Sequence, residues 1–166
     1  MMDVRSEEKR DHAQVYELVT AAFGREDEAR LVERLRGVCG YLSLITVLDS
    51  RVIGHISFTP LFLSNARTRF VGLAPLSVRP GFQEQGVGSR LVRDGLKQCV
   101  DAGRTAAFVL GSPSYYSRFG FEPANRYGFR CEYAVPADNF MVLKLEASSS
   151  HGKNGLIRYD SVFAGL

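Results

Sequence analysis

The chain has 166 residues and few of the side chains that usually build metal or redox sites. It contains three cysteines and three histidines, all widely scattered: Cys39, Cys99, Cys131, His12, His55 and His151. An odd number of distant cysteines fits neither a zinc-ligand pattern nor a C-x-x-C redox pair, so small buried apolar positions are their expected role. The scattered histidines also argue against a bound ion, and we expect no metal site.

The sequence also lacks long apolar runs and a strong charge of either sign. No apolar segment is long enough to cross a membrane, and the first ten residues are highly charged, unlike a secretory signal. We therefore expect a cytoplasmic protein with no membrane partner. The net charge is only +3 and no long stripe of lysine and arginine is present, which argues against nucleic acid as the main partner.

The length suits one domain with a hydrophobic core. Apolar periodicity predicts helices at residues 11–23, 27–36 and 86–101, and a short one from 112 to about 120. Runs rich in β-formers predict strands at 4–6, 42–48, 52–63, 70–78, 106–110, 127–133 and 140–145. Residues 49–51 are turn formers between two such runs and indicate a hairpin. This order fits an α/β domain with a mixed sheet.

Two helix starts carry recognisable capping signals. Asp11 is followed three residues later by Gln14, which predicts a capping box at the start of the first helix. Ser112 precedes Pro113, and this pair predicts a serine cap with proline in the first turn of the short helix.

Residues 76–91 are the most informative stretch for function. They are expected to form a strand, a tight turn and a helix start that contains Gly86 and Gly88. A helix start leaves several backbone N–H groups unpaired, and its partial positive charge favours anions. The two glycines allow a bulky anion to approach the backbone, so we interpret this turn as a pyrophosphate site. A glycine-rich turn with only a structural role is the alternative.

Two common phosphate-binding motifs do not fit this turn. A Walker-type loop requires Gly-Lys-Ser or Gly-Lys-Thr, but Gly88 is followed by Ser89 and Arg90. A dinucleotide fingerprint requires a third glycine, where this chain has Leu91, and an acid after the next strand. The apolar run 106–110 is followed by glycine and serine instead.

The motif that remains is Gln83-x-x-Gly86-x-Gly88. It resembles the acyl-CoA-binding motif (Gln/Arg)-x-x-Gly-x-(Gly/Ala) of the GNAT N-acetyltransferase superfamily. Residues 76–80, Leu-Ser-Val-Arg-Pro, resemble the fourth strand of that family with its proline exit, and residues 116–121 resemble its Tyr-x-x-x-Gly-Phe motif. The three motifs occur in the expected order and spacing.

The resemblance implies a single GNAT-like domain over residues 1–147. Its central sheet would be mixed and mostly antiparallel, flanked by helices, with fourth and fifth strands that splay apart around the acyl-pantetheine arm. Residues 148–166 are expected to form a C-terminal extension that packs on the same domain. The implied activity is acetyl-CoA-dependent N-acetyl transfer to a primary amine of a small molecule or protein.

The resemblance also implies which residues bind acetyl-CoA. Backbone N–H groups from Glu84 to Ser89 would bind the pyrophosphate, and Gln83 would brace the turn. The edge of the fourth strand would pair with the pantetheine amides as an added strand does, and would present an N–H to the thioester oxygen. The expected cofactor-binding residues are Leu76, Ser77, Val78, Gln83, Glu84, Gln85, Gly86, Val87, Gly88 and Ser89.

Tyr116 is the candidate general acid, because it lies where the family has its catalytic tyrosine. With a reference pKa of ~10, against ~8.5 for a thiol, it stays protonated at neutral pH and can protonate the departing thiolate. The alternative is that Tyr116 belongs to an aromatic core cluster. The sequence departs from the family at Val109, where many relatives have an asparagine that contacts pantetheine; the turn at 111–113 is a candidate substitute.

No general base is assigned. The acids at 26–28 are candidates, although acids also favour the first turn of a helix, and Glu122 and His55 are further candidates without support. Three arginines are candidates for phosphate contacts, with a solvated surface role as the simpler expectation: Arg79, Arg90 and Arg118.

Two other functions stay open at this point. One is a CoA-binding or sensing module without catalysis, and the other is an acyltransferase with another acyl chain or a hydroxyl acceptor. The identity of the acceptor amine has no motif, and a homodimer is left open.

Overall fold

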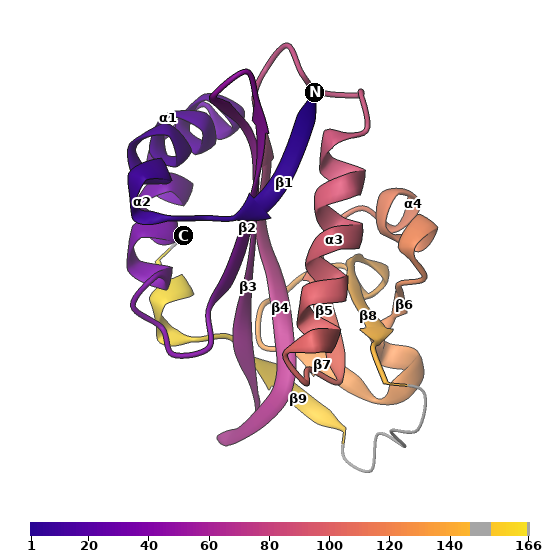
Figure 1. The fold of residues 1–166 in the computed structure, drawn as a ribbon. Coiled ribbons are helices and arrows are strands. Elements are labelled where there is room, and N and C mark those ends of the chain that lie inside the picture. Colours follow the sequence, from indigo (N-terminus) through magenta and orange to yellow (C-terminus); the bar gives the residue numbers. More distant parts are fainter. Residues whose placement is uncertain (147–153, 166) are drawn as a thin grey trace. The chain divides into compact units, whose positions relative to one another are not determined.

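The computed structural model describes residues 1–146 and 154–165 (Figure 1). Its strands are β1 (Met2–Ser6), β2 (Leu42–Leu48), β3 (Arg51–Leu63), β4 (Ala66–Val78), β5 (Ala106–Leu110), β6 (Glu122–Pro123), β7 (Phe129–Cys131), β8 (Phe140–Lys144) and β9 (Gly155–Arg158). Its α-helices are α1 (His12–Phe23), α2 (Asp27–Leu35), α3 (Val87–Asp101) and α4 (Pro113–Tyr116). Short 3-10 segments are η1 (Lys9–Asp11), η2 (Ser117–Phe119), η3 (Ala124–Tyr127), η4 (Ala137–Asn139) and η5 (Ser161–Phe163).

Hydrogen bonds order the strands as β1-β2-β3-β4-β5-β8-β6, and β9 bonds to β3 and β7. The sheet contains parallel and antiparallel pairs, so the predicted α/β fold with a mixed sheet flanked by helices is confirmed. No helix in the described ranges combines the length and the apolar character needed to span a bilayer.

The chain divides into two compact units. The first contains Met1–Thr59, Ala74–Gly95 and Val162–Leu166, and the second contains Pro60–Leu73 and Leu96–Ser161. Strands β3 and β4 and helix α3 therefore each contribute residues to both units.

In the first unit, β1, β2 and β3 form antiparallel pairs. The connection between β2 and β3 is the predicted hairpin, but its turn is two residues long because Arg51 already belongs to β3. Asp49 and Ser50 both have positive φ, 49° and 64°. Two such residues in sequence form the tight hairpin turn whose twist matches that of the strands.

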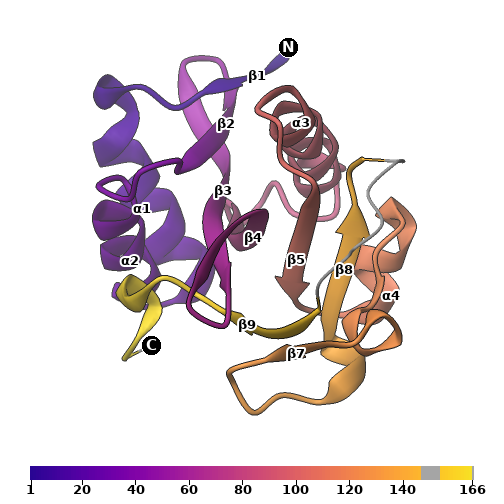
Figure 2. The same cartoon turned by 90° about the horizontal axis from the view of Figure 1, so that it is seen from below.

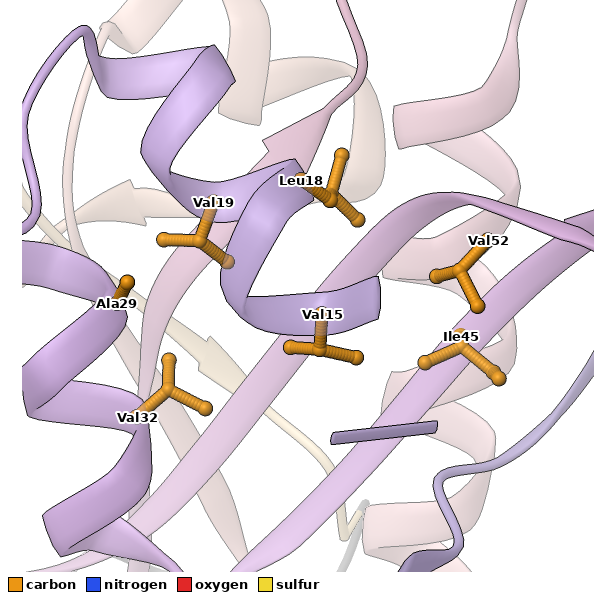
Figure 3. Close-up of a cluster of buried hydrophobic side chains, with 7 residues drawn as sticks. All are labelled: Val15, Leu18, Val19, Ala29, Val32, Ile45 and Val52. Atoms are coloured by element: carbon orange, nitrogen blue, oxygen red, sulfur yellow. The ribbon is translucent and has the colours of Figure 1, made fainter. Parts of the chain in front are cut away.

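Helices α1 and α2 cover one face of these strands with a continuous apolar cluster (Figure 3). Its members repeat at helical spacing in α1 and α2, and β2 and β3 contribute one residue each: Val15, Leu18, Val19, Ala29, Val32, Ile45 and Val52. All are at most 1% exposed. Burial of a branched aliphatic side chain stabilises a fold by roughly 1.5–3 kcal/mol, so this cluster holds both helices on the strands.

The first half of α3 packs closely on β3. A Cβ added to Gly54 would lie 2.8 Å from side-chain atoms of both Val87 and Leu91, and one added to Gly95 would lie 2.4 Å from the Phe58 ring. Only glycine at these two contacts lets helix and strand approach so closely. This packing fixes where α3 begins relative to β3.

The prediction of a capping box at Asp11 and Gln14 is wrong, because the box begins three residues earlier. The box is formed by Glu8 and Asp11, whose carboxylate accepts the Glu8 N–H at 2.7 Å. The Asp11 carboxylate also accepts two hydrogen bonds from Arg5, at 2.8 and 2.9 Å. Gln14 instead accepts the backbone N–H of Val52 at 2.9 Å and so ties α1 to β3.

Two further local predictions are also wrong. Ser112 occupies the N-cap position of α4, but its hydroxyl is 2.9 Å from that of Ser114 and makes no cap bond. The proline after it does lie in the first turn, as expected. Cys39 is exposed, whereas Cys99 is buried and Cys131 is half-buried. Cys39 lies in the turn between α2 and β2.

In the second unit, β5 is the central strand. It pairs in parallel with β4 over Phe70–Gly72 and antiparallel with β8 along its whole length (Figure 2). The short parallel register is compatible with the predicted splay of the fourth and fifth strands. An aromatic cluster fills this unit, with ring centroids 5.0–5.7 Å apart, and consists of Phe70, Phe108, Phe129 and Phe140.

The last strands differ most from the predictions. The strand predicted at 127–133 is only Phe129–Cys131, because residues 124–127 form η3. Strand β9 was not predicted, and it pairs in parallel with β7 and antiparallel with β3. Tyr159 and Phe163 are each 8% exposed. The loop predicted at 148–150 lies outside the described residues.

Candidate functional site

The turn after β4 is tight and anchored to β3. The Arg79 N–H donates to the Ile53 carbonyl at 2.8 Å, and the Phe82 N–H donates back to the Arg79 carbonyl at 2.9 Å. Gly81, Glu84 and Gly86 have positive φ values of 93°, 60° and 85°. Three left-handed residues in six reverse the chain sharply between the strand and α3.

The start of α3 presents unpaired backbone donors. Among the described residues, the first backbone bond of this helix runs from the Arg90 N–H to the Gly86 carbonyl, at 3.0 Å. The preceding N–H groups, of Val87, Gly88 and Ser89, have no acceptor within the helix. A Cβ added to Gly86 would meet nothing within 4 Å, so the space beside it is open. An anion can therefore reach these N–H groups and the positive end of the helix.

Two glutamine side chains tie this turn together. Gln83 Nε2 donates to the Val78 carbonyl at 3.1 Å, and Gln85 Nε2 donates to the Gly81 carbonyl at 3.2 Å. Gln83 therefore links the turn to the last residue of β4. The backbone of the turn is held by its own side chains while residues 83–86 stay exposed.

The last part of β4 leads directly into this turn. Leu76 and Val78 are half-buried, and Ser77 between them is 2% exposed. The Ser77 hydroxyl has no hydrogen-bond partner among the described residues. All ten residues predicted to bind the cofactor thus lie in one continuous segment of the first unit.

The three arginines considered for phosphate contacts have other partners. The Arg79 guanidinium donates to the Val52 carbonyl at 3.2 Å, and its burial lowers its pKa. Arg90 donates to the Met2 carbonyl at 3.1 Å and pairs with Asp94. Arg118 lies 4.4 Å from the centre of the Tyr115 ring. In the first unit, the backbone N–H groups at the start of α3 therefore remain the main candidates for binding an anion.

Tyr116 is the last residue of α4, in the second unit. Its ring packs against Tyr115 and Phe121, with centroid distances of 5.0 and 5.7 Å. It also lies directly on Gly111, since a Cβ there would be 2.4 Å from the Tyr116 ring. Burial raises the pKa of Tyr116 to about 12. No hydrogen-bond partner of its hydroxyl lies among residues 1–146 and 154–165, so the group is a protonated donor without an internal acceptor.

Each acidic or histidine candidate for the general base has an internal partner. Glu26 accepts hydrogen bonds from Tyr16 and Arg30, and Glu28 pairs with Arg25 at 2.5 Å. His55 is fully buried, with Nε2 3.3 Å from a carboxylate oxygen of Glu7. Glu122 accepts a short hydrogen bond from Tyr127 and pairs with Arg126. Asp27 lies 3.7 Å from Arg25.

Val109, at the position where many relatives have asparagine, is 1% exposed and pairs with Met141 of β8. Its side chain is therefore part of the core. Within the described ranges, no group of three or more histidine, cysteine or acidic side chains is arranged to hold a metal ion.

A pocket of about 180 Å³ in the second unit was not predicted. It lies among η3, β7, η4 and the start of β8, and its lining is mostly apolar and aromatic. The sequence carries no motif for it, because its walls come from short irregular segments. Three aromatic residues between 129 and 140, Phe129, Tyr133 and Phe140, are the sequence feature of this region.

Comparison with known proteins settles the family. Residues 3–124 match the family described as "Acetyltransferase (GNAT) domain". The chain belongs to the GNAT acetyltransferase family. It is 35% identical over 149 residues to Escherichia coli YhbS, an uncharacterized N-acetyltransferase, with 88% of this chain and 89% of that protein covered.

Two solved GNAT structures share the whole fold. The crystal structure of Escherichia coli YhbS in complex with CoA has a TM-score of 0.92 and 33% identity, and covers 98% of this chain and 91% of that one. A GNAT acetyltransferase from Brucella melitensis in complex with acetyl-CoA has a TM-score of 0.81 and 31% identity, with 98% of both chains covered. The predicted family and enzyme class are thereby confirmed.

Proposed function

We propose that this GNAT acetyltransferase binds acetyl-CoA at the turn after β4 and transfers its acetyl group to a primary amine. The observation that carries the proposal is the open start of α3, where the N–H groups of residues 87–89 lack helical acceptors beside a glycine with free space. Two relatives above 30% identity were crystallised with CoA or acetyl-CoA, which supports the same ligand here.

Each predicted cofactor residue has a role in this proposal. The backbone N–H groups from Glu84 to Ser89 bind the pyrophosphate, and the Ser89 hydroxyl adds one hydrogen bond. Gln83 holds the turn in place through its bond to the Val78 carbonyl. The backbone of Leu76, Ser77 and Val78 pairs with the pantetheine amides and stabilises the thioester oxygen as it gains charge.

Tyr116 is the proposed general acid. The neutral amine nitrogen attacks the thioester carbonyl carbon, a C–N bond forms, and the C–S bond breaks. The CoA sulfur leaves as a thiolate and takes the hydroxyl proton of Tyr116. The new amide loses its extra proton to water, and the Tyr116 phenolate regains a proton from water. A tyrosine with a pKa near 12 is protonated at every physiological pH. It becomes a useful donor only as the thiolate departs, because transfer to a stable thiolate is uphill.

The proposal extends to the organisation and location of the protein. Residues 1–147 form the catalytic domain, and 148–166 form an extension on it; the pairing of β9 with β3 and β7 supports this assignment. The protein acts in the cytoplasm. A homodimer leaves the proposal unchanged, since every residue that it uses belongs to one chain.

Calorimetry and a thiol-release assay test the proposal together. CoA and acetyl-CoA should bind with measurable heat, and acetyl-CoA should release free thiol when a suitable amine is present. The amine panel should include polyamines, amino acids, aminoglycosides and peptides. Absence of any binding heat in folded protein would refute the cofactor site. Binding without acetylation of any amine would favour a CoA sensor, and a preference for longer acyl thioesters would redefine the donor.

A further inference from the structure

His55 is a fully buried titratable residue of β3 that the proposed reaction does not use. Its Nε2 lies 3.3 Å from a carboxylate oxygen of Glu7. Because a carboxylate only accepts hydrogen bonds, Nε2 of the neutral imidazole carries the proton and Nδ1 carries the lone pair. Nδ1 is buried and has no hydrogen-bond partner among residues 1–146 and 154–165. The ring therefore offers an unused proton-accepting atom in the first unit.

Glu7 holds this ring in place. Burial raises the pKa of Glu7, but the hydrogen bonds and charges of His55 and Arg36 outweigh it and lower the pKa to about 2, so the carboxylate is ionised at neutral pH. The carboxylate also accepts hydrogen bonds from Arg36 at 2.6 Å and from Ser43 at 2.9 Å. A carboxylate on one ring nitrogen stabilises the positive charge that the ring gains when the other nitrogen takes a proton. Glu7 is thus a positioning residue for His55.

Ser77 of β4 is the cross-strand neighbour of His55. Strands β3 and β4 are adjacent in the sheet and are joined by residues 64–65 alone, so they run antiparallel. The Arg79 N–H donates to the Ile53 carbonyl at 2.8 Å, a bond that joins directly opposite residues in such a pair. Two residues further along β3 and two residues back along β4, His55 lies opposite Ser77. Side chains of opposite residues share a face, with Cβ atoms roughly 4.5–5.5 Å apart.

The Ser77 hydroxyl is the second unused polar group. The side chain is 2% exposed, and its hydroxyl has no hydrogen-bond partner among the described residues, so it does not bond to His55 in this structure. A serine hydroxyl turns between staggered positions about χ1, and it both donates and accepts. Ser77 is also the middle residue of segment 76–78, whose backbone holds the thioester in the proposed function. We therefore expect an amine that attacks this thioester to lie beside Ser77.

We infer that His55 is the proton acceptor of the acetyl transfer and that the Ser77 hydroxyl relays the proton. As the C–N bond forms, the amine nitrogen gives its extra proton to Ser77 Oγ, and the Ser77 hydroxyl proton passes to His55 Nδ1. The imidazolium pairs with Glu7 and later releases the proton to water, which restores the neutral ring. This inference rests on the proposed acetyltransferase function, and it adds the base through which the proton reaches water.

Three variants test the role of His55. His55→Gln keeps an N–H donor for Glu7 and removes the basic nitrogen, and Ser77→Ala removes only the relay hydroxyl. Tyr41→Phe is the matched control, since it removes a hydroxyl of the same unit that lies 2.6 Å from Ser57 Oγ. Calorimetry should show that all three variants bind CoA with an affinity close to that of the wild type, which also confirms that they fold.

Two amines of similar size and unequal basicity distinguish a base from a structural residue. The probes are ethylamine and trifluoroethylamine, and thiol release from acetyl-CoA gives kcat/KM for each. Because fluorine withdraws electrons from the nitrogen, trifluoroethylamine loses its proton to water readily without a base. His55→Gln and Ser77→Ala should lower kcat/KM by about 100-fold for ethylamine and by less than about tenfold for trifluoroethylamine. Tyr41→Phe should leave the ratio of the two amines unchanged.

Nitrogen-15 NMR of the histidine rings tests the base without turnover, on wild-type protein loaded with CoA. The chain has three histidines, so His12→Gln and His151→Gln assign the His55 signals by elimination. At neutral pH, Nε2 of His55 should carry a proton and Nδ1 should not. A proton on Nδ1 would overturn the inference, even if His55→Gln does not fold.

The outcomes separate this inference from the acetyltransferase proposal. A loss confined to ethylamine supports His55 as the base, whereas equal losses with both amines, or none, refute it and leave the activity standing. A wild-type ratio in Ser77→Ala refutes the relay. If the wild type acetylates other amines but neither probe, the protonation of Nδ1 decides. If it acetylates no amine at all, the acetyltransferase proposal itself fails, and the role of His55 fails with it.

Discussion

At the scale of single residues, the chemistry of Tyr116 depends on what surrounds its ring. Tyr115 and Phe121 contact the ring edge to face, and Gly111 lets it lie against the backbone. The same burial raises the pKa of the phenol to about 12, because the phenolate would lose its hydration. The side chain is therefore held in place by apolar contacts and is kept protonated by them.

Tyr116→Phe should separate catalysis from binding. Phenylalanine keeps every ring contact and removes only the hydroxyl, so we expect kcat to fall by roughly 100-fold, within the range for general acid catalysis. The CoA affinity and the melting temperature should stay close to wild type. Thiol release and calorimetry measure the two effects. Tyr115→Phe is the control, since it makes the same change on the neighbouring ring. An equal loss of kcat in both variants would show that Tyr116 is not the general acid.

At the scale of secondary-structure elements, glycines with positive φ mark both ends of α3. Gly86, with φ of 85°, precedes the helix, and Gly103, with φ of 78°, follows it. At both positions an added Cβ would meet nothing within 4 Å. A non-glycine residue would therefore meet no steric clash at either position. It would only have to adopt the left-handed backbone conformation, which costs an L-residue roughly 1–2 kcal/mol. Both glycines adopt a left-handed backbone conformation, and they lie at opposite ends of one helix.

Gly86→Ala and Gly103→Ala should therefore have equal effects on stability and unequal effects on ligand binding. Each should lower the free energy of unfolding by about 1 kcal/mol, measured by chemical denaturation. Only Gly86→Ala should weaken CoA binding, by about tenfold or more, because the methyl group fills the space in front of the N–H groups of residues 87–89. Calorimetry gives both affinities. Similar CoA affinities in the two variants would mean that the phosphates bind elsewhere.

The sequence predicts the elements whose signals are local. Strands β2 and β5 have the predicted bounds, and α3 starts one residue later than expected, because apolar periodicity and glycine positions define them directly. β9 was missed, since four residues after a polar segment become a strand only through the edges of β3 and β7. The capping box lies at Glu8 because the Asp11 carboxylate accepts the Glu8 N–H, while Gln14 accepts a hydrogen bond from β3 instead.

The candidate site likewise has one part that the sequence predicts and one part that it does not. The turn at residues 79–89 could be predicted because its glycines, its glutamines and the helix start lie in one short segment. The pocket in the second unit could not, because β7 is positioned by β9 and the start of β8 is positioned by β5. Those contacts join residues far apart in the chain, and no spacing rule describes them.

At the scale of the whole molecule, stability in acid depends on a buried carboxylate. The Glu7 side chain is 2% exposed and accepts hydrogen bonds from Arg36 at 2.6 Å, Ser43 at 2.9 Å and His55 at 3.3 Å. These partners come from the end of α2 and from β2 and β3. Burial alone would raise the pKa of Glu7, but the hydrogen bonds and charges of His55 and Arg36 outweigh it and lower the pKa to about 2.

Because the folded protein holds Glu7 with a pKa below its ordinary value of 4.5, the carboxylate stabilises the fold above pH 4.5. This contribution, on the order of 3 kcal/mol, is lost as the pH falls from about 4.5 to about 2. Glu7→Gln should therefore be less stable than wild type at pH 7 and should lose less stability over that acid range. Chemical denaturation at several pH values measures both slopes.

Two further variants make this test specific to Glu7. Glu33→Gln, at an exposed position of α2, should follow the wild-type pH dependence, since its carboxylate is in water. Ser43→Ala removes one of the hydrogen bonds to Glu7 and leaves those with Arg36 and His55 in place, so its acid slope should lie between those of wild type and Glu7→Gln. If the stability of Glu7→Gln depends on pH as steeply as that of the wild type, other carboxylates cause the acid sensitivity. Asp11 is the next candidate, because the hydrogen bonds from Arg5 lower its pKa.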